Sequence, residues 1–184
     1  MARNTLSRSL HDLGLSAWFG GTLANAVSLN TAASAAGSTP ATGAVANVGW
    51  DRWAPVNAAA IGAHLVGSVG QLAGNKGRLG GQQGVASMAA AKTALTVAAL
   101  GVTAYSRMLG RKVSEQTDVP AQDGTTPTAG TPSDVAKAQK QLRALQWAVP
   151  ALTGALVVVS SFAGEQQRAT EAHKGLVGRL TPGR

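Results

Sequence analysis

Cysteine is absent from this 184-residue chain, and charged residues are scarce. Without cysteine, the chain can form no disulfide, no thiolate metal site and no cysteine nucleophile. Only 13% of the residues are charged, and they gather in short clusters separated by long uncharged tracts. Because a water-soluble helix needs a polar face, such tracts are typical of helices that contact lipid.

Catalytic motifs are missing as well. The sequence has no HExxH motif, no phosphate-binding loop ending in Lys-Ser/Thr, and no paired carboxylates within an uncharged tract. The glycine-rich segment 74–84 lacks the strand and helix context of a phosphate loop, and we interpret it as a turn. We therefore expect no enzymatic activity.

The charge balance is positive, with a formal net charge of +8. The sixteen lysines and arginines are scattered among the ends of the uncharged tracts, and no basic helix interleaved with aromatic residues occurs. Anionic lipid headgroups account for such cations more simply than nucleic acid does. We expect the lipid bilayer, and no nucleic acid, among the partners.

Four tracts have the length of roughly 20 residues that a helix needs to cross a hydrocarbon core of about 30 Å. They lie at 13–34, 54–75, 85–106, which contains Lys92, and 144–164. The predicted fold class is therefore all-α, a four-helix transmembrane bundle forming a single membrane domain. We expect a flexible linker at 115–132, rich in Pro, Thr and Gly, and a polar tail at 165–184.

Aromatic residues and cations give the expected topology. Four aromatic residues, which prefer the headgroup zones, lie at tract ends: Trp50, Trp53, Tyr105 and Trp147. Arg3 and Arg8 precede the first tract, whereas no cation follows it until Arg52. Because cations favour the cytoplasmic side, this asymmetry predicts cytoplasmic termini.

Small and hydrogen-bonding residues align on one face of each tract. In the second tract, this stripe contains Asn57, Ala60, His64, Gly67 and Gln71. In membranes, such stripes hold helices together through close backbone contact and interhelical hydrogen bonds worth roughly 1 kcal/mol each. We expect the stripes to form a small, polar interior.

Counting from the tract ends places four polar residues near the middle of the bilayer: Asn25, His64, Thr96 and Thr153. Lys92 lies about two turns into the third tract. An ionisable group at such depth marks a functional site, so these five residues form the candidate intramembrane polar site. Two structural alternatives stay open. Lys92 can extend to the interface, and His64 can bond to Asn25 or Ser28.

A neutral imidazole also serves as a ligand of haem or copper, or as a proton relay, which makes His64 a candidate for either role. The second candidate ligand is His11. With the tracts placed as above, His11 lies on the order of 15 Å from His64 in depth. We therefore expect the two histidines not to share one ligand unless the tracts are shifted by several residues.

The chain resembles an uncharacterised family of small four-helix membrane proteins from high-GC Gram-positive bacteria. Four segments carry the resemblance, which covers most of the chain: SLHDLGLSAWFGGTLANAVSLN, WDRWAPVNAAAIGAHLVG, AAKTALTVAALGVTAYSRMLGRKV and LRALQWAVPALTG. It implies the bacterial plasma membrane and no activity. More distantly, His11 followed by Trp18, Phe19, Gly20 and Gly21 resembles the opening of copper-resistance-D-type membrane proteins, where a four-helix unit is associated with copper or haem handling.

Three functions are compatible with this sequence. The favoured one is an accessory or scaffold subunit that acts through helix–helix contacts with a membrane-protein partner or with a second copy of itself. The second is a haem- or copper-binding bundle that uses His64, with His11 as a further candidate ligand. The third is a small conduit or transporter-like bundle lined by His64 and Lys92.

Overall fold

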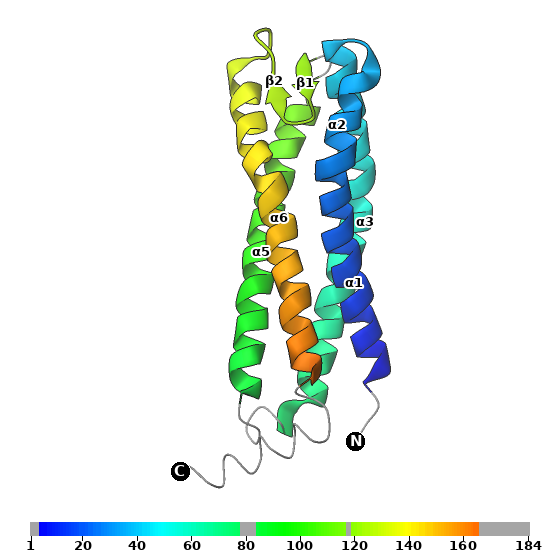
Figure 1. The fold of residues 1–184 in the computed structure, drawn as a ribbon, viewed down its shortest axis with the longest axis vertical. Coiled ribbons are helices and arrows are strands. Elements are labelled where there is room, and N and C mark those ends of the chain that lie inside the picture. The colour runs from blue at the N-terminus through cyan, green and yellow to red at the C-terminus, as the bar shows by residue number, and fades with distance from the viewer. Residues whose placement is uncertain (1–3, 78–83, 117–118, 166–184) are drawn as a thin grey trace.

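The computed structural model describes residues 4–77, 84–116 and 119–165. Four long helices run side by side along one axis, and the first helix starts at the same end at which the last one finishes (Figure 1). Within the described ranges, three short helical pieces continue the first helix, and one short hairpin connects the last two helices. The prediction of an all-helical chain is confirmed. Arg3 and all of the predicted polar tail except Glu165 lie outside the described residues.

The first helical column consists of four consecutive pieces, α1 (Thr5–Ala24), the π-helical turn η1 (Asn25–Leu29), α2 (Asn30–Ala33) and the 3-10 turn η2 (Ser34–Ala36). Gly37 then turns the chain with a φ of 85°, a value that glycine adopts without strain. The Ser38 side chain caps α3 (Thr39–Gly74) by accepting a hydrogen bond from the Ala41 amide at 3.4 Å.

The second half of the chain contains α5 (Val85–Ser114), β1 (Ala121–Asp123), β2 (Thr126–Pro127) and α6 (Ser133–Glu165). Both long helices are longer than the tracts expected at 85–106 and 144–164. The same holds for the first half, where helices begin at Thr5 and Thr39 and not at 13 and 54. Charged residues limit the part of a helix that can face lipid, but they do not end the helix.

Two helices in the described part of the chain, α5 and α6, are long and apolar enough to cross a membrane. Only 6% of the apolar window of α5 and 22% of that of α6 are buried within the chain. The core helix of a water-soluble protein would bury much more of this surface. The tracts on α1 and α3 contain more glycine and polar residues, and they fall below the same hydropathy limit.

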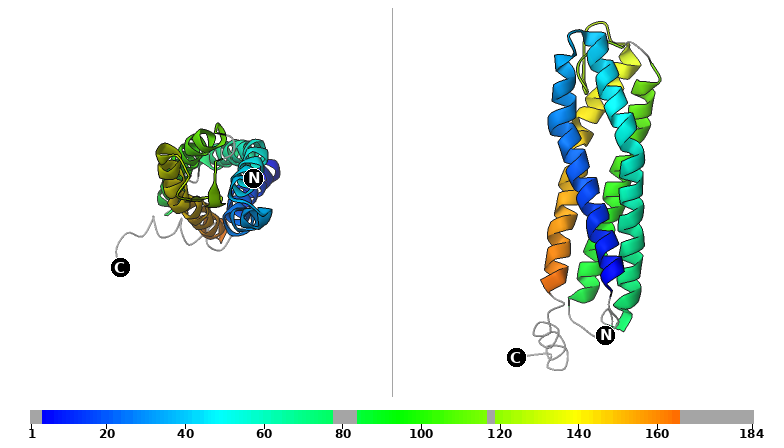
Figure 2. Two further views of the ribbon diagram at one scale, coloured as in Figure 1. Left: turned by 90° about the horizontal axis from the view of Figure 1, so that it is seen from above. Right: turned by 90° about the vertical axis from the view of Figure 1, so that its right-hand side faces the viewer.

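The helices are arranged in two pairs, α1 against α3 and α5 against α6, and α1 also contacts α6 (Figure 2). Glycine makes the first pair very close. A Cβ atom on Gly14 would overlap the Ala60 carbonyl and the His64 backbone, and one on Gly67 would overlap the backbones of Ser7 and His11. The backbones of α1 and α3 are therefore in direct contact, as in small-residue membrane interfaces.

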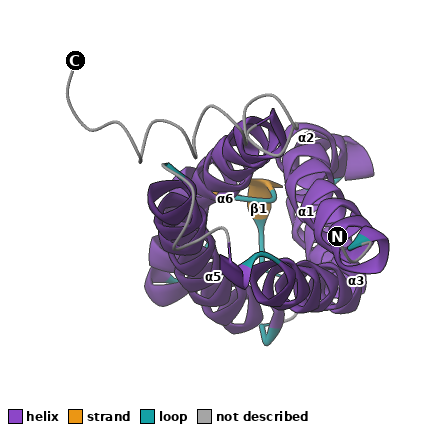
Figure 3. Ribbon diagram, turned by 90° about the horizontal axis from the view of Figure 1, so that it is seen from below, coloured by secondary structure: helices purple, strands orange, loops and turns teal. Residues whose placement is uncertain are grey.

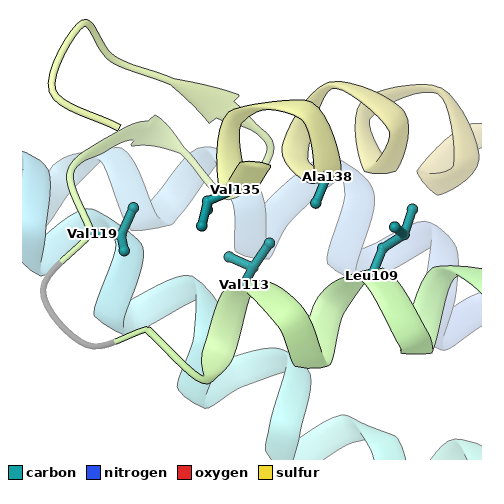
Figure 4. Packing of buried hydrophobic residues seen from close by; sticks show 5 residues of the cluster. All are labelled: Leu109, Val113, Val119, Val135 and Ala138. Atoms are coloured by element: carbon teal, nitrogen blue, oxygen red, sulfur yellow. The ribbon is translucent and has the colours of Figure 1, made fainter. Parts of the chain in front are cut away.

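The segment expected to be a flexible linker instead carries the antiparallel β1–β2 hairpin. Asp123 organises its turn, because its carboxylate accepts hydrogen bonds from the Thr125 amide at 2.7 Å and the Thr126 hydroxyl at 2.8 Å. Val119, just before the hairpin, joins a buried apolar cluster between α5 and α6 (Figure 4). The other buried members of this cluster are Leu109, Val113, Val135 and Ala138.

Polar contacts tie the helices together at the hairpin end of the molecule. The Trp50 indole donates to Asn30 Oδ1 at 2.8 Å, and Asn30 Nδ2 donates to Gln146 Oε1 at 2.6 Å. Arg107 on α5 forms an ion pair with Asp51 on α3 at 2.7 Å. This end is thus closed by the hairpin and by side-chain contacts between all of the long helical columns.

Replacing Gly14 by alanine tests the backbone contact between α1 and α3. We expect Gly14→Ala to lower the free energy of unfolding by about 1–3 kcal/mol, because the added methyl group must push the two helices apart. Thermal unfolding in detergent measures the change. The matched control is Gly62→Ala on the open side of α3, where a Cβ meets nothing within 4 Å. Equal stability of the two variants would contradict the contact.

Candidate functional site

His11 and His64 are in direct contact at the centre of the α1–α3 interface. Their ring centroids are 4.5 Å apart, the rings are tilted by 47°, and the two residues are 1% and 0% exposed. The expected separation of about 15 Å in depth is wrong. The two helices are offset from the predicted alignment, so the histidines, which lie far apart in sequence, share one layer of the structure.

The glycine contacts explain this offset. Aligning the ends of the tracts 13–34 and 54–75 would place Gly14 opposite Gly74, whereas Gly14 lies against His64, a shift of about 15 Å along the axis. A signal for this register is present in the sequence. Gly14 and Gly21, and likewise Gly67 and Gly74, are spaced so that each pair lies on one side of its helix.

The hydrogen bonds of the two imidazoles define which nitrogen carries the proton. His11 Nδ1 lies 2.7 Å from Asp12 Oδ1, and an ionised carboxylate can only accept a hydrogen bond. His64 Nδ1 lies 3.4 Å from the His11 carbonyl oxygen, which also can only accept. Both Nδ1 atoms are therefore donors, and in the neutral rings both Nε2 atoms keep their lone pairs.

Neither Nε2 atom has a close hydrogen-bond partner among the described residues. His11 Nε2 is buried without any partner, although Asp12 next to it occupies the other ring nitrogen. His64 Nε2 has a single long contact, 3.5 Å to Thr96 Oγ1 on α5. Two buried rings in contact thus each keep an Nε2 lone pair without a close partner, and each ring is oriented by its other nitrogen.

Trp18 covers the histidine pair toward the hairpin end. Its ring centroid is 6.1 Å from that of His64, and its indole is completely buried with Ala99 and Val149. Trp18 Nε1 donates to Thr103 Oγ1 on α5 at 3.2 Å, which fixes the plane of the indole. On this side, the histidines are therefore sealed by an apolar wall.

A cavity of about 590 Å³ lies on the opposite side of the histidines. His11, Asp12, Lys92 and Thr96 line it, together with residues of α3 and α6. Seen from below, the four long helices are arranged in a ring (Figure 3), and each of them contributes residues to the cavity wall. The structure thus brings His64 and Thr96 into contact, and it places Lys92 in the cavity beside His11.

Asn25 and Thr153 are the other two residues of the predicted polar site, and neither forms a hydrogen bond with His64 among the described residues. Asn25 is on η1, about 16 Å further along the first column than Gly14, and it forms no hydrogen bond with His64. Thr153 is buried on α6, where its hydroxyl donates to the Val149 carbonyl at 2.8 Å. The His11 carbonyl and Thr96 occupy the positions expected for Asn25 and Ser28.

In the described part of the chain, no group of three or more His, Cys, Asp or Glu side chains is placed to hold a metal ion. The protein ligands that the site offers are therefore the two imidazoles. Two nitrogen ligands leave coordination positions open, unlike a closed structural site with four protein ligands.

The bond between Trp18 and Thr103 gives a test of how α5 is held against the histidine layer. We expect Thr103→Val to lower the free energy of unfolding by about 0.5–1.5 kcal/mol, since it removes the acceptor of the Trp18 indole and keeps the side-chain shape. Thr93→Val is the matched control, because the Thr93 hydroxyl bonds within its own helix and is exposed. In a Trp18→Phe background the effect should vanish, and a persisting effect would contradict the bond.

Comparison with protein-family models, with curated proteins and with solved structures found no match to this chain. The resemblances noted in the sequence therefore stay expectations. The functional argument depends on the geometry of the histidine pair, the cavity beside it and the apolar surface of the helices.

Proposed function

We propose that the chain is a multi-pass protein of the bacterial plasma membrane, in which the four long helices form a transmembrane bundle that binds a copper ion between His11 and His64. The observation that carries the proposal is the contact of two buried imidazoles, 4.5 Å apart, whose Nε2 lone pairs have no close partner. Metal binding would satisfy both lone pairs at once.

The spacing of charged and aromatic residues supports the placement of the helices in a bilayer. Between Trp53 and Asn75, α3 has no charged residue over about 33 Å, close to the thickness of a hydrocarbon core. The first half of α5 carries only Lys92 before the ion pair of Arg107 with Asp51. The ion pair and Trp53 thus mark one headgroup zone, and the helix ends near Asn75 mark the other.

This placement leaves the hairpin end of the molecule outside the lipid. The cations at 107–143, the β1–β2 hairpin and the Asn30 contacts all lie beyond the headgroup zone of Trp53. Arg8 is in the first turn of α1, at the opposite end. We propose cytoplasmic termini, which places the hairpin on the outer side of the membrane.

Imidazole ligands and the absence of thiolates favour copper or zinc, and copper binds such sites more tightly than other divalent metals. With metal–nitrogen bonds of about 2 Å, two imidazoles on a tetrahedral ion have ring centroids about 5 Å apart. The observed centroid separation of 4.5 Å is close to this value. Asp12 supplies the carboxylate–histidine contact that orients metal-binding imidazoles in many proteins.

A haem held by both histidines does not fit this geometry. The two axial ligands of a haem iron stand on opposite faces of the macrocycle, so two rings in direct contact cannot both be axial ligands. The accessory or scaffold function stays a prediction, since it requires a partner that no contact of the described residues identifies. The conduit lined by His64 and Lys92 also stays a prediction.

Copper titration of the detergent-purified protein tests the metal site. We expect one copper ion per chain, and affinity at least about tenfold lower in both His11→Gln and His64→Gln, because each variant removes one of two protein ligands. We expect Asp12→Asn to lower the affinity by about 10–100-fold through the loss of ring orientation. In Cu(II)-loaded protein, paramagnetic resonance should report two coupled nitrogens, and one in each histidine variant.

His173→Gln changes the third histidine of the chain and is the matched control, which should bind copper like the unaltered protein. Circular dichroism checks that every variant is folded. Copper affinity unchanged in folded His11→Gln and His64→Gln would refute the site. A Soret band in the purified protein would show that the chain binds haem, which would contradict the copper proposal.

Single cysteines test the topology, because the chain has none of its own. In intact cells, a membrane-impermeant maleimide should label Gln122→Cys on β1, and it should label Lys76→Cys only after permeabilisation. Ala151→Cys, exposed on the lipid-facing side of α6, should resist labelling in both conditions. The reverse pattern for Gln122→Cys and Lys76→Cys would show that the termini lie outside the cell. Rapid labelling of Ala151→Cys would show that α6 does not lie in the bilayer.

A further inference from the structure

A second cavity lies inside the bundle, nearer the hairpin than the first cavity beside His11. Its volume is about 110 Å³, and residues of all four long helices and of the hairpin turn form its wall. Among the described residues of this wall, the one with a charged side chain is Arg107, which is ion-paired with Asp51. Asn, Gln, Ser and Thr side chains supply the other polar groups, together with two indoles. Such a wall suits small, uncharged, hydrogen-bonding molecules.

The two cavities follow one another along the axis of the bundle. On α5, which runs from the end where α1 starts to the hairpin end, the first cavity ends at Leu100 and the second begins at Thr103 (Figure 1). These positions are about 4.5 Å apart along the helix. On α6 the second cavity ends at Val149 and the first begins at Val157, a distance of about 12 Å. A thin layer of side chains therefore separates the cavities.

This layer is the apolar cluster around Trp18. Trp18, Ala99 and Val149 are its buried members, and Leu100 is one of the apolar residues packed against them. Leu100 also lines the first cavity and Val149 lines the second, so the cluster is in contact with both. Water avoids a narrow apolar constriction, and channels use such constrictions to close.

Unpaired polar atoms in the walls of both cavities are suited to bind water. In the second cavity they are the donor Trp53 Nε1 and the acceptor Asn57 Oδ1, and in the first they are Gln71 Nε2 and Ser160 Oγ. All four atoms are buried without a hydrogen-bond partner among the described residues. Buried polar groups nearly always have a partner, and ordered water is a common one. Each cavity far exceeds the roughly 10–15 Å³ that one water molecule needs.

Trp18 is held across the layer by a hydrogen bond. The side chain belongs to α1 and is 0% exposed, and its Nε1 donates to Thr103 Oγ1 on α5 at 3.2 Å. Thr103 is also part of the wall of the second cavity. When the indole turns away from Thr103, both groups can bond to water in that cavity, so the net cost of breaking this bond is small.

We propose that the interior of the bundle is a water channel in its closed state, with Trp18 as the gate and its bond to Thr103 as the latch. Water occupies both cavities, and it passes between them when the indole turns out of the layer. The channel excludes ions, because an ion would have to lose its water in the apolar layer. The proposal rests on the membrane placement proposed above and not on copper binding.

Osmotic shrinkage of proteoliposomes, followed by stopped-flow light scattering, tests the gate. A metal chelator in the buffer keeps the result independent of the copper site. We expect Trp18→Ala to raise the water permeability per chain at least about tenfold, because it removes the largest side chain from the constriction. Thr103→Val should raise it about fivefold, since the loss of one hydrogen bond shifts the population from closed to open. Trp147→Ala is the matched control, because Trp147 is half exposed and lines neither cavity.

Hydroxyl-radical footprinting of the unaltered chain in detergent examines the cavities without a variant or a bilayer. Radicals formed from enclosed water should label Met88 in the first cavity and Trp53 in the second, and Trp18 should stay unlabelled. Four results would overturn the proposal. They are absence of label at Met88 and Trp53, unchanged permeability of folded and reconstituted Trp18→Ala, unchanged permeability of Thr103→Val, and an equal rise in Trp147→Ala. Loss of the membrane placement alone would appear in the cysteine labelling described above.

Discussion

Gly14 and Gly67 let the backbones of α1 and α3 meet, and the position of every group between these helices depends on that contact. In the proposed membrane setting, helices gain little from burying apolar surface against each other, so close backbone packing stabilises the pair. The contact also sets the register. It places His11 beside His64, supports both rings on rigid helices, and leaves the histidine layer facing α5.

The two sides of α1 and α3 differ in packing, and this difference organises the proposed chemistry. One side is the glycine interface, where the backbones touch at Gly14 and Gly67. The other side faces α5 and α6 across the cavity, and α5 contacts α3 much less than it contacts α6. The tightly packed pair thus holds the two histidines in place, while the looser side contains the cavity.

The uncharged tracts located all four long helices, because charge is costly wherever a helix faces lipid. The buried face of α3 could also be predicted from the sequence, since Asn57, Ala60, His64 and Gly67 of the predicted stripe are all buried. The register of the helices could not be predicted in this way, because the ends of an uncharged tract do not mark the ends of its helix: α3 begins at Thr39, well before the tract 54–75. The contact of His11 with His64 could not be predicted because it depends on this register. The hairpin could not be predicted because it depends on tertiary packing, which local composition does not show.

The π-helical turn at Asn25–Leu29 allows one column to meet two different sets of partners. Below it, Trp18 and Thr22 face the layers inside the proposed membrane, and above it Asn30 reaches Trp50 and Gln146. An extra residue in the wider turn changes the phase of the helix. Deleting one residue there would rotate the upper segment by about 100° relative to the lower one. The turn therefore separates two sets of contacts along one helical column, so that the contacts above the turn can change in evolution without moving the histidines.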